Sequence, residues 1–208
     1  MKKVYVAITG DIVESRFLRQ RDEVQEKLRK ILENINKKFK ECIVVKFCFT
    51  LGDEFQGLVN SLEKSYAIVS EIQKLIFPVR IYFGVGMGNI STKIYSRTSE
   101  MDGECFFRSR AALNEAKKIN QSVVYNTQTE FDLAINTIIK LIDVIKKDWK
   151  SIHYKRIHLY QQFGTIEKVA RIEKVTKQSI SKMFKDIKFN EVRSAEENIK
   201  KMLSTIKS

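Results

Sequence analysis

The chain has 208 residues, of which 43% are hydrophobic and 10% aromatic, and its formal net charge at pH 7 is +13. This composition predicts a globular protein with one medium core, or one core and a small satellite domain, and excludes a low-complexity or disordered chain. The apolar run after Met1 is too short for a signal peptide and no run reaches the length of a membrane span, so we expect a cytoplasmic protein without a membrane partner.

The cysteines and histidines argue against a zinc site. Cys42, Cys48 and Cys105 are odd in number and lack metal-ligand spacing, which favours reduced thiols in a protein core. His153 and His158 are five positions apart, so they do not share a face of a helix.

The positive charge is denser toward the C-terminus. Residues 1–130 hold 21 basic and 16 acidic side chains, whereas the shorter remainder holds 17 and 9. Attraction to nucleic acid and a lysine-rich solvated surface both explain this distribution.

Strand and helix patterns alternate over the first 126 residues. Apolar and β-branched runs predict strands, and apolar residues three or four apart predict helices. The predicted elements are a strand at 3–9 that stops at Gly10, a helix at 21–39, strands at 43–50 and 54–59 around a Gly52-Asp53 hairpin turn, a helix at 62–76, a strand at 79–87 opened by Pro78, a helix at 105–118 and a strand at 121–125.

This order predicts an α+β domain over residues 1–126, with helices packed on an antiparallel-containing sheet of the ferredoxin-like sort. The rest of the chain has only helical patterns. A very apolar helix at 129–149 is expected between two parts of the protein or at a dimer contact, so residues 127–150 form a connector and residues 151–208 a second domain.

Two aspartates follow glycines at the ends of apolar runs. Asp11 follows Gly10, and Asp53 follows Gly52 in the predicted hairpin. If the two strands are neighbours, both carboxylates and the carbonyl of Ile12 could hold Mg²⁺ or Mn²⁺ over a triphosphate, with the backbone amides of residues 12–15 near phosphate. Each pair alone is an ordinary turn signal, but two pairs after buried strands favour a site.

These segments resemble nucleotide cyclases. Thr9–Ser15 resembles the first metal motif of class III nucleotide cyclases, and Leu51–Phe55 resembles the GGDEF hairpin of diguanylate cyclases. Arg80–Gly88 and the helix Cys105–Ala116 after Asp102-Gly103 match later cyclase elements. The nucleotide-binding residues that these matches indicate are Gly10, Ser15, Gly52, Glu54, Arg80, Arg108 and Arg110.

Three positions depart from the cyclase pattern. Phe49 stands where class III cyclases carry a base-reading lysine, and Phe107 and Ala111 stand where their transition-state asparagine and arginine belong. The resemblance therefore implies nucleotide and metal binding without implying efficient turnover.

The arrangement is similar, more closely, to the bacterial SatD family. The agreeing segments are Gly10–Val13 with Ser15, Glu23–Leu28, Thr50–Leu58, Phe83–Gly86, Ile90–Thr92 and Asp102-Gly103, which span most of residues 1–120. The family also carries a C-terminal helix-turn-helix. The resemblance implies a nucleotide-cyclase-like palm domain followed by an all-α helix-turn-helix domain.

The C-terminal part contains a candidate helix-turn-helix. Thr165 is the predicted N-cap of a first short helix, and Thr176 begins a second after a turn that has Lys174 in the usual glycine position. An ordinary helical hairpin, or a protein contact, is the alternative. The residues expected to face DNA are Thr176, Lys177, Gln178, Ser179, Ser181 and Lys182.

Three functions remain open at this level. The first is a DNA-binding regulator whose palm domain binds a nucleotide, a divalent metal or both. The second is an active metal-dependent nucleotidyl cyclase or nucleotidyltransferase with a DNA-binding arm. The third is an adaptor with vestigial sites. A homodimer is expected for each, since helix-turn-helix proteins and cyclases commonly work in pairs.

Overall fold

The computed structural model describes residues 3–14 and 21–206. The chain forms two compact units, one of residues 1–140 with 199–208 and one of residues 141–198. Both divisions fall inside helices, so α4 (Phe131–Lys146) and α8 (Phe189–Thr205) each contribute to both units. The division into domains at residues 126 and 150 stays a prediction.

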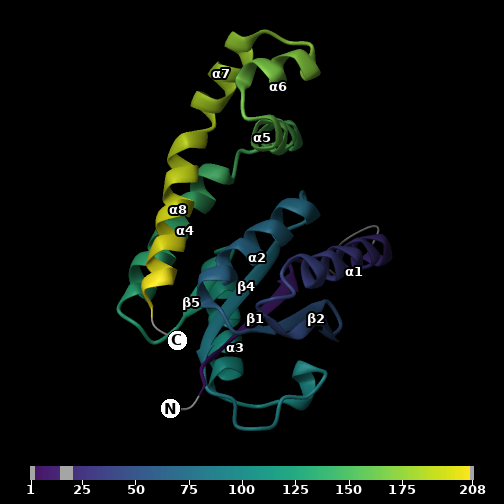
Figure 1. The fold of residues 1–208 in the computed structure, drawn as a ribbon, viewed down its shortest axis with the longest axis vertical. Coiled ribbons are helices and arrows are strands. Elements are labelled where there is room, and N and C mark those ends of the chain that lie inside the picture. Colours follow the sequence, from purple (N-terminus) through teal and green to yellow (C-terminus); the bar gives the residue numbers. More distant parts are fainter. Residues whose placement is uncertain (1–2, 15–20, 207–208) are drawn as a thin grey trace. The chain divides into compact units, whose positions relative to one another are not determined.

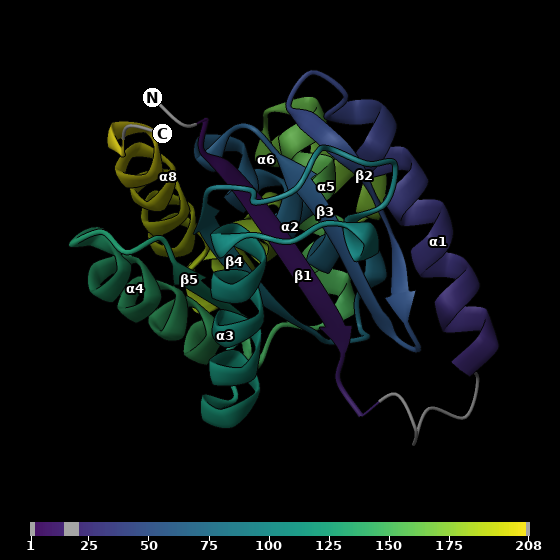
Figure 2. The same ribbon diagram turned by 90° about the horizontal axis from the view of Figure 1, so that it is seen from below.

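The first unit is built on a five-stranded sheet in the order β2-β3-β1-β4-β5 (Figures 1 and 2). Only the β4–β5 pair is parallel. The connections β1-α1-β2-β3-α2-β4 with the order β2-β3-β1-β4 form a ferredoxin-like core, which confirms the predicted α+β class. The elements are β1 (Tyr5–Ile12), α1 (Arg21–Lys38), β2 (Ile43–Leu51), β3 (Glu54–Val59), α2 (Leu62–Ile76), β4 (Ile81–Gly88), the 3₁₀ turn η2 (Thr98–Glu100), α3 (Glu104–Ile119) and β5 (Val123–Asn126).

Helices cover both faces of the sheet. The aromatic rings of Phe49, Phe55 and Phe83 form a row of edge-to-face contacts on one face, where α1 packs with Arg29 over the Phe49 ring. The opposite face packs against α3, since a Cβ atom at Gly84 or Gly86 would meet the backbone of that helix at 2.1 Å. We call these the α1 face and the α3 face.

Strand β1 is longer than predicted. Gly10 does not end the strand but pairs with Phe55 and Phe83, and the strand continues to Ile12. The glycine is required on the α1 face, because a Cβ atom there would lie 2.3 Å from the Phe55 ring. Similarly, β4 begins at Ile81 rather than at Val79, so Pro78 lies ahead of the strand.

The second unit is helical. It contains the end of α4, α5 (Ser151–Phe163), α6 (Ile166–Glu173), α7 (Lys177–Asp186) and the start of α8. The rings of Tyr160, Phe184 and Phe189 pack together, and the indole N–H of Trp149 donates to the carbonyl of Ile187 at 3.1 Å. Trp149 and Tyr160 therefore support the packing of these helices, while Ile152 is 37% exposed.

Across residues 3–14 and 21–206, the helices are too short or too polar to cross a membrane.

Candidate functional site

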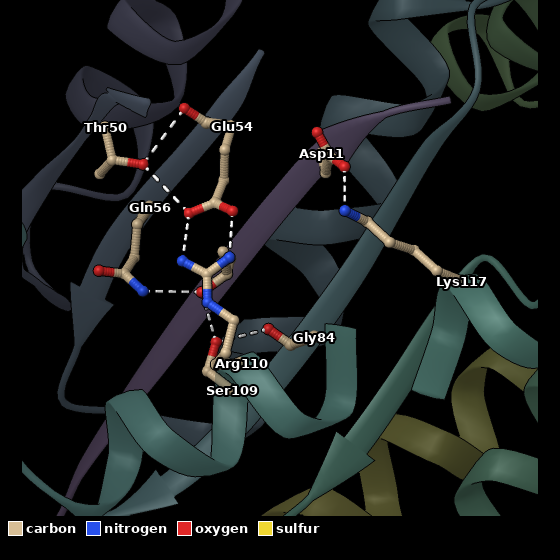
Figure 3. Close-up of polar contacts among 9 residues, drawn as sticks. Asp11, Thr50, Glu54, Gln56, Gly84, Ser109, Arg110 and Lys117 are labelled. Atoms are coloured by element: carbon tan, nitrogen blue, oxygen red, sulfur yellow. Dashed lines mark hydrogen bonds and ion pairs between the residues drawn. The ribbon is translucent and has the colours of Figure 1, made fainter. Parts of the chain in front are cut away.

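Charged side chains gather on the α3 face at the end of β1. Asp11 is the next-to-last residue of β1 and forms an ion pair with Lys117 of α3 (Figure 3). Its side chain is 22% exposed, so the pair is partly shielded from water. Lys117 was absent from the residues predicted for the site.

A second ion pair lies beside the first. Glu54 of β3 is the cross-strand neighbour of Asp11, so both carboxylates project from the α3 face. The guanidinium of Arg110 bonds both oxygens of Glu54, and these hydrogen bonds raise the pKa of Arg110 above its usual value. The hydroxyl of Thr50 also donates to Glu54, at 3.2 Å (Figure 3). The predicted residues Asp11, Glu54 and Arg110 are thus brought together.

A buried hydrogen-bond chain lies beneath these pairs. The amide of Gln56 donates to the hydroxyl of Thr9 at 2.8 Å, and the Ser109 hydroxyl donates to the carbonyl of Gly84 at 3.0 Å. Because the Ser109 proton is used in this way, Thr9 donates to Ser109 at 2.6 Å. The chain fixes α3 on the sheet and so positions Arg110 and Lys117 (Figure 3).

Asp53 engages different partners. Its carboxylate accepts hydrogen bonds from Arg21 at 2.8 and 3.2 Å and from Gln25, both on α1. Asp53 is 9% exposed and turns toward the helix of the α1 face, whereas Asp11 projects from the α3 face. The two carboxylates predicted to share a metal therefore contact helices on opposite sides of the sheet.

The donor set does not fit a divalent metal as it stands. Asp11, Asp53 and Glu54 each bond a basic side chain, with which a cation would have to compete for the carboxylate oxygens. The described part of the chain holds no group of three or more His, Cys, Asp or Glu side chains suited to a metal ion. Ile12 is 3% exposed and paired with Ile81.

A pocket of about 320 Å³ opens beside the end of β1. It is lined in part by Arg80, Tyr82 and Asn120, and Tyr82 is the cross-strand neighbour of Asp11. The side-chain oxygen of Asn120 accepts from Arg80 at 2.9 Å and from the Tyr82 hydroxyl at 2.8 Å. Arg80 was predicted, whereas Tyr82 and Asn120 were not. Glu14 also lines the pocket.

The remaining predicted nucleotide residues have structural roles or lie elsewhere. Arg108 donates to the carbonyl of Met87 at 2.6 Å and pairs with Glu104, so it secures the start of α3. Gly52 has φ of 58° in the two-residue turn between β2 and β3, where such hairpins favour glycine. The amide of Val13 donates to the carbonyl of Arg80, so it is not free for phosphate. Ser15 lies outside the described residues.

One signal for the missed lysine was present in the sequence. Arg110 and Lys117 are seven positions apart in one helix, which places them two turns apart on the same face. Once Arg110 was considered near phosphate, this spacing also indicated Lys117. Tyr82 and Asn120 had no such signal, because their contact depends on how α3 packs on β4.

The candidate DNA-facing residues lie at the start of α7. Thr165 and Thr176 are the N-caps of α6 and α7, and Lys174 in the turn has φ of 53°. Ile180 and Phe184 are buried, so α7 turns one face to the unit and the other to solvent. The six predicted residues are all exposed: Thr176, Lys177, Gln178, Ser179, Ser181 and Lys182.

Three ion pairs hold this region together. Lys177 pairs with Glu167 of α6, which joins the two helices. Glu173, at the end of α6, pairs with Lys155 at 2.7 Å and with Arg156 at 3.3 Å, and its side chain is only 7% exposed. Hydrogen bonds from Lys155, then Arg156, lower the pKa of Glu173 below its usual value.

The chain therefore combines a ferredoxin-like α+β unit, which carries two ion pairs on one sheet face, with a helical unit. The chain belongs to the SatD family, whose model matches residues 5–199. No curated protein matches the chain.

Three solved structures show distant similarity to the chain. A bacterial light-regulated adenylyl cyclase is 11% identical, with a TM-score of 0.44 over 60% of this chain and 76% of that chain. The guanylyl cyclase domain of the RhoGC fusion protein from the aquatic fungus Blastocladiella emersonii is 14% identical, with a TM-score of 0.39 over 52% and 72%. A regulator of polyketide synthase expression from Bifidobacterium adolescentis is 11% identical, with a TM-score of 0.27 over 97% and 86%. At these low scores the similarities carry no argument about function.

Proposed function

We propose that this protein is a DNA-binding regulator whose α+β unit binds a nucleotide. The observation that carries the proposal is the exposed start of α7, where polar and basic side chains stand opposite the buried Ile180 and Phe184. A capped helix with such a face suits contacts to base edges and phosphates in a major groove. In this proposal α6, the turn at Lys174 and α7 are a helix-turn-helix.

Nucleotide binding is proposed for the α3 face. Arg80 lines the pocket of about 320 Å³, while Lys117 pairs with Asp11 and Arg110 with the neighbouring Glu54. Cationic side chains on two elements can hold phosphate oxygens, and the Tyr82 ring and Asn120 offer a stacking surface and hydrogen bonds. Binding would then require Lys117 to exchange Asp11 for a phosphate.

DNA binding is tested with fluorescently labelled duplexes selected from a randomised library, followed by anisotropy at several salt concentrations. Replacing Lys177 and Lys182 together by alanine should weaken binding and reduce the salt slope by about 1.8, or about 0.9 for each lost phosphate contact. The matched control is Lys200→Ala with Lys201→Ala, two exposed lysines on α8. Equal affinities for the wild type and the Lys177/Lys182 variant would refute the proposal.

A second candidate is a metal-dependent nucleotidyl cyclase or nucleotidyltransferase. One observation favours it: Asp11 and Glu54 are cross-strand neighbours on the same face, so a carboxylate pair exists there without Asp53. Both carboxylates are bonded to basic side chains, and no reaction step is assigned to a metal.

The two candidates are separated by incubating the protein with ATP and GTP, with Mg²⁺ or Mn²⁺, and with and without DNA. Mass spectrometry then follows the nucleotides. A cyclic or oligomeric product that disappears in Asp11→Asn and Glu54→Gln would establish the enzyme. Unchanged nucleotides under every condition would leave the regulator as the function.

A further inference from the structure

A pocket in the unit of residues 141–198 lies apart from the charged α3 face and shares only Ser179 and Lys182 with the residues proposed to face DNA. It is an open pocket among the end of α4, α5 and α7, with a volume of about 660 Å³. This volume is within the range of about 300–1,000 Å³ that is usual for small-molecule sites. All of its lining residues lie between Val144 and Lys188, so the pocket belongs to one unit.

One wall of the pocket is apolar. It contains Trp149, Met183 and Ile187. The indole is fixed, because its N–H donates to the Ile187 carbonyl and its ring packs edge-to-face on Tyr154, with centroids 5.4 Å apart. A rigid aromatic wall beside a thioether suits a planar apolar group.

A histidine offers a hydrogen-bond donor. The backbone N–H of Lys150 donates to Nδ1 of His153 at 3.1 Å, so the proton of the neutral ring is on Nε2. Burial, followed by the nearby charges of Lys150 and Arg156, lowers the pKa of His153. This shift favours the neutral ring, whose Nε2–H is a donor in a positively charged surrounding.

Cations outnumber carboxylates around the pocket. Arg156 is only 17% exposed, and its Nη1 donates to the sulfur of Met183 at 3.6 Å, which is a weak acceptor. Its Nε shares Glu173 with Lys155, so one carboxylate serves two cations. The lining charges are Lys150, Arg156, Lys182 and Lys188 against Asp148 and Asp186.

From this combination we infer that the pocket binds a small organic anion that carries an apolar ring system. The ring lies against Trp149 and Met183, and the anionic group accepts hydrogen bonds from Arg156 and Lys182. Neither a neutral apolar molecule nor inorganic phosphate uses both halves of the pocket.

The site has a consequence for α7. Ser179 and Lys182 line the pocket and also belong to the residues proposed to face DNA. A bound anion would engage Lys182 and so weaken DNA binding, a consequence that rests on the proposed function. The ligand site itself does not, so the two can fail separately.

The test uses the single tryptophan of the chain, Trp149, as a reporter inside the pocket. The full-length protein is titrated with anilinonaphthalene sulfonate, an anionic aromatic probe, while tryptophan fluorescence is followed. We expect saturable quenching of Trp149. Lys182→Gln should raise the dissociation constant at least about fivefold, because a charged hydrogen bond is lost.

Two controls make the result decisive. Lys185→Gln removes the same charge from an exposed position of α7 that does not line the pocket, and it should leave the dissociation constant unchanged. N-phenylnaphthylamine, which has similar rings without the sulfonate, should bind more weakly than the anionic probe. The inference is overturned by unsaturable quenching, by equal losses in the two lysine variants, or by equal binding of the neutral probe.

Discussion

Asp11 of β1 pairs with Lys117 of α3, so the negative charge of the carboxylate at the end of the first strand is balanced by a lysine. The neighbouring Glu54–Arg110 pair repeats the arrangement across the β1–β3 ladder. A cation that binds Asp11 or Glu54, or an anion that binds Lys117 or Arg110, must therefore compete with an existing ion-pair partner.

The first prediction concerns this displacement. Replacing Asp11 by asparagine should strengthen the binding of ATP in the presence of EDTA by about fivefold, because a negative charge is removed and Lys117 is released. Isothermal titration calorimetry measures the change. Asp22→Asn, an exposed acidic position on α1, is the matched control and should leave affinity unaltered.

Lys117→Met should have the opposite effect and reduce the affinity for ATP by a similar factor. If instead ATP binds only with Mg²⁺ and Asp11→Asn abolishes that binding, the carboxylate holds a metal and the charge-displacement account is wrong.

The second prediction concerns the close approach of α3 to the sheet. Gly86→Ala should lower the free energy of unfolding by about 1–3 kcal/mol or more, because its Cβ atom would lie 2.1 Å from the backbone nitrogen of Ser109. Urea denaturation measures the loss. Since α3 carries Arg110 and Lys117, weaker ATP binding should accompany it.

Gly52→Ala is the comparison for this variant. A Cβ atom there has no neighbour within 4 Å, so only the left-handed φ of 58° opposes the substitution. The expected loss is about 1 kcal/mol. Equal losses of unfolding free energy in the two variants would show that α3 shifts at little cost to accommodate a larger residue at position 86.

The third prediction concerns acid stability of the helical unit. The folded pKa of Glu173 is lowered by Lys155 and Arg156, so its contribution to stability is present above the unfolded pKa of about 4.3 and is lost as pH falls through the folded value. Trp149 fluorescence during denaturation reports the stability of this unit at each pH.

Glu173→Gln should be less stable than the wild type at pH 7, and the difference should shrink steadily as the pH falls below about 4.3. A difference that stays constant down to acidic pH would show that Glu173 acts through packing rather than charge.

The fourth prediction concerns the start of α7. The hydroxyl of Thr176 accepts from the backbone N–H of Ser179 at 3.1 Å, so Thr176→Ala should destabilise the helical unit by about 1 kcal/mol and weaken DNA binding. Thr176→Ser keeps the cap and should retain both properties. Anisotropy and urea denaturation measure them. If DNA binding is lost in both variants, the methyl group of Thr176 itself contacts the DNA.

Much of the fold followed from local patterns. The apolar spacing in residues 21–39 and 62–76 predicted α1 and α2, and the threonines at 165 and 176 predicted two helix starts. These features depend on neighbours within one turn, which the sequence contains directly. The order of elements then left few topologies besides the ferredoxin-like core.

The arrangement of the candidate site could be predicted only in part from the sequence. The sequence indicated that Asp11 lies near the end of β1 and that Asp53 lies in the turn between β2 and β3, but the faces on which they lie did not follow. Side chains of a strand alternate between faces, so the two residues that extend β1 beyond Gly10 decide which helix Asp11 meets. The hairpin turn likewise directs Asp53 to Arg21 and Gln25.

The sequence by itself determined the types and limits of most elements, the charge of the C-terminal part and the exposed polar face of α7, because each is a property of residues near one another in the chain. The tertiary structure decided that Lys117 compensates Asp11, that α1 holds Asp53, and that Trp149, Arg156 and Lys182 surround one pocket. These contacts join distant segments, and their geometry depends on how helices pack on the sheet and on each other.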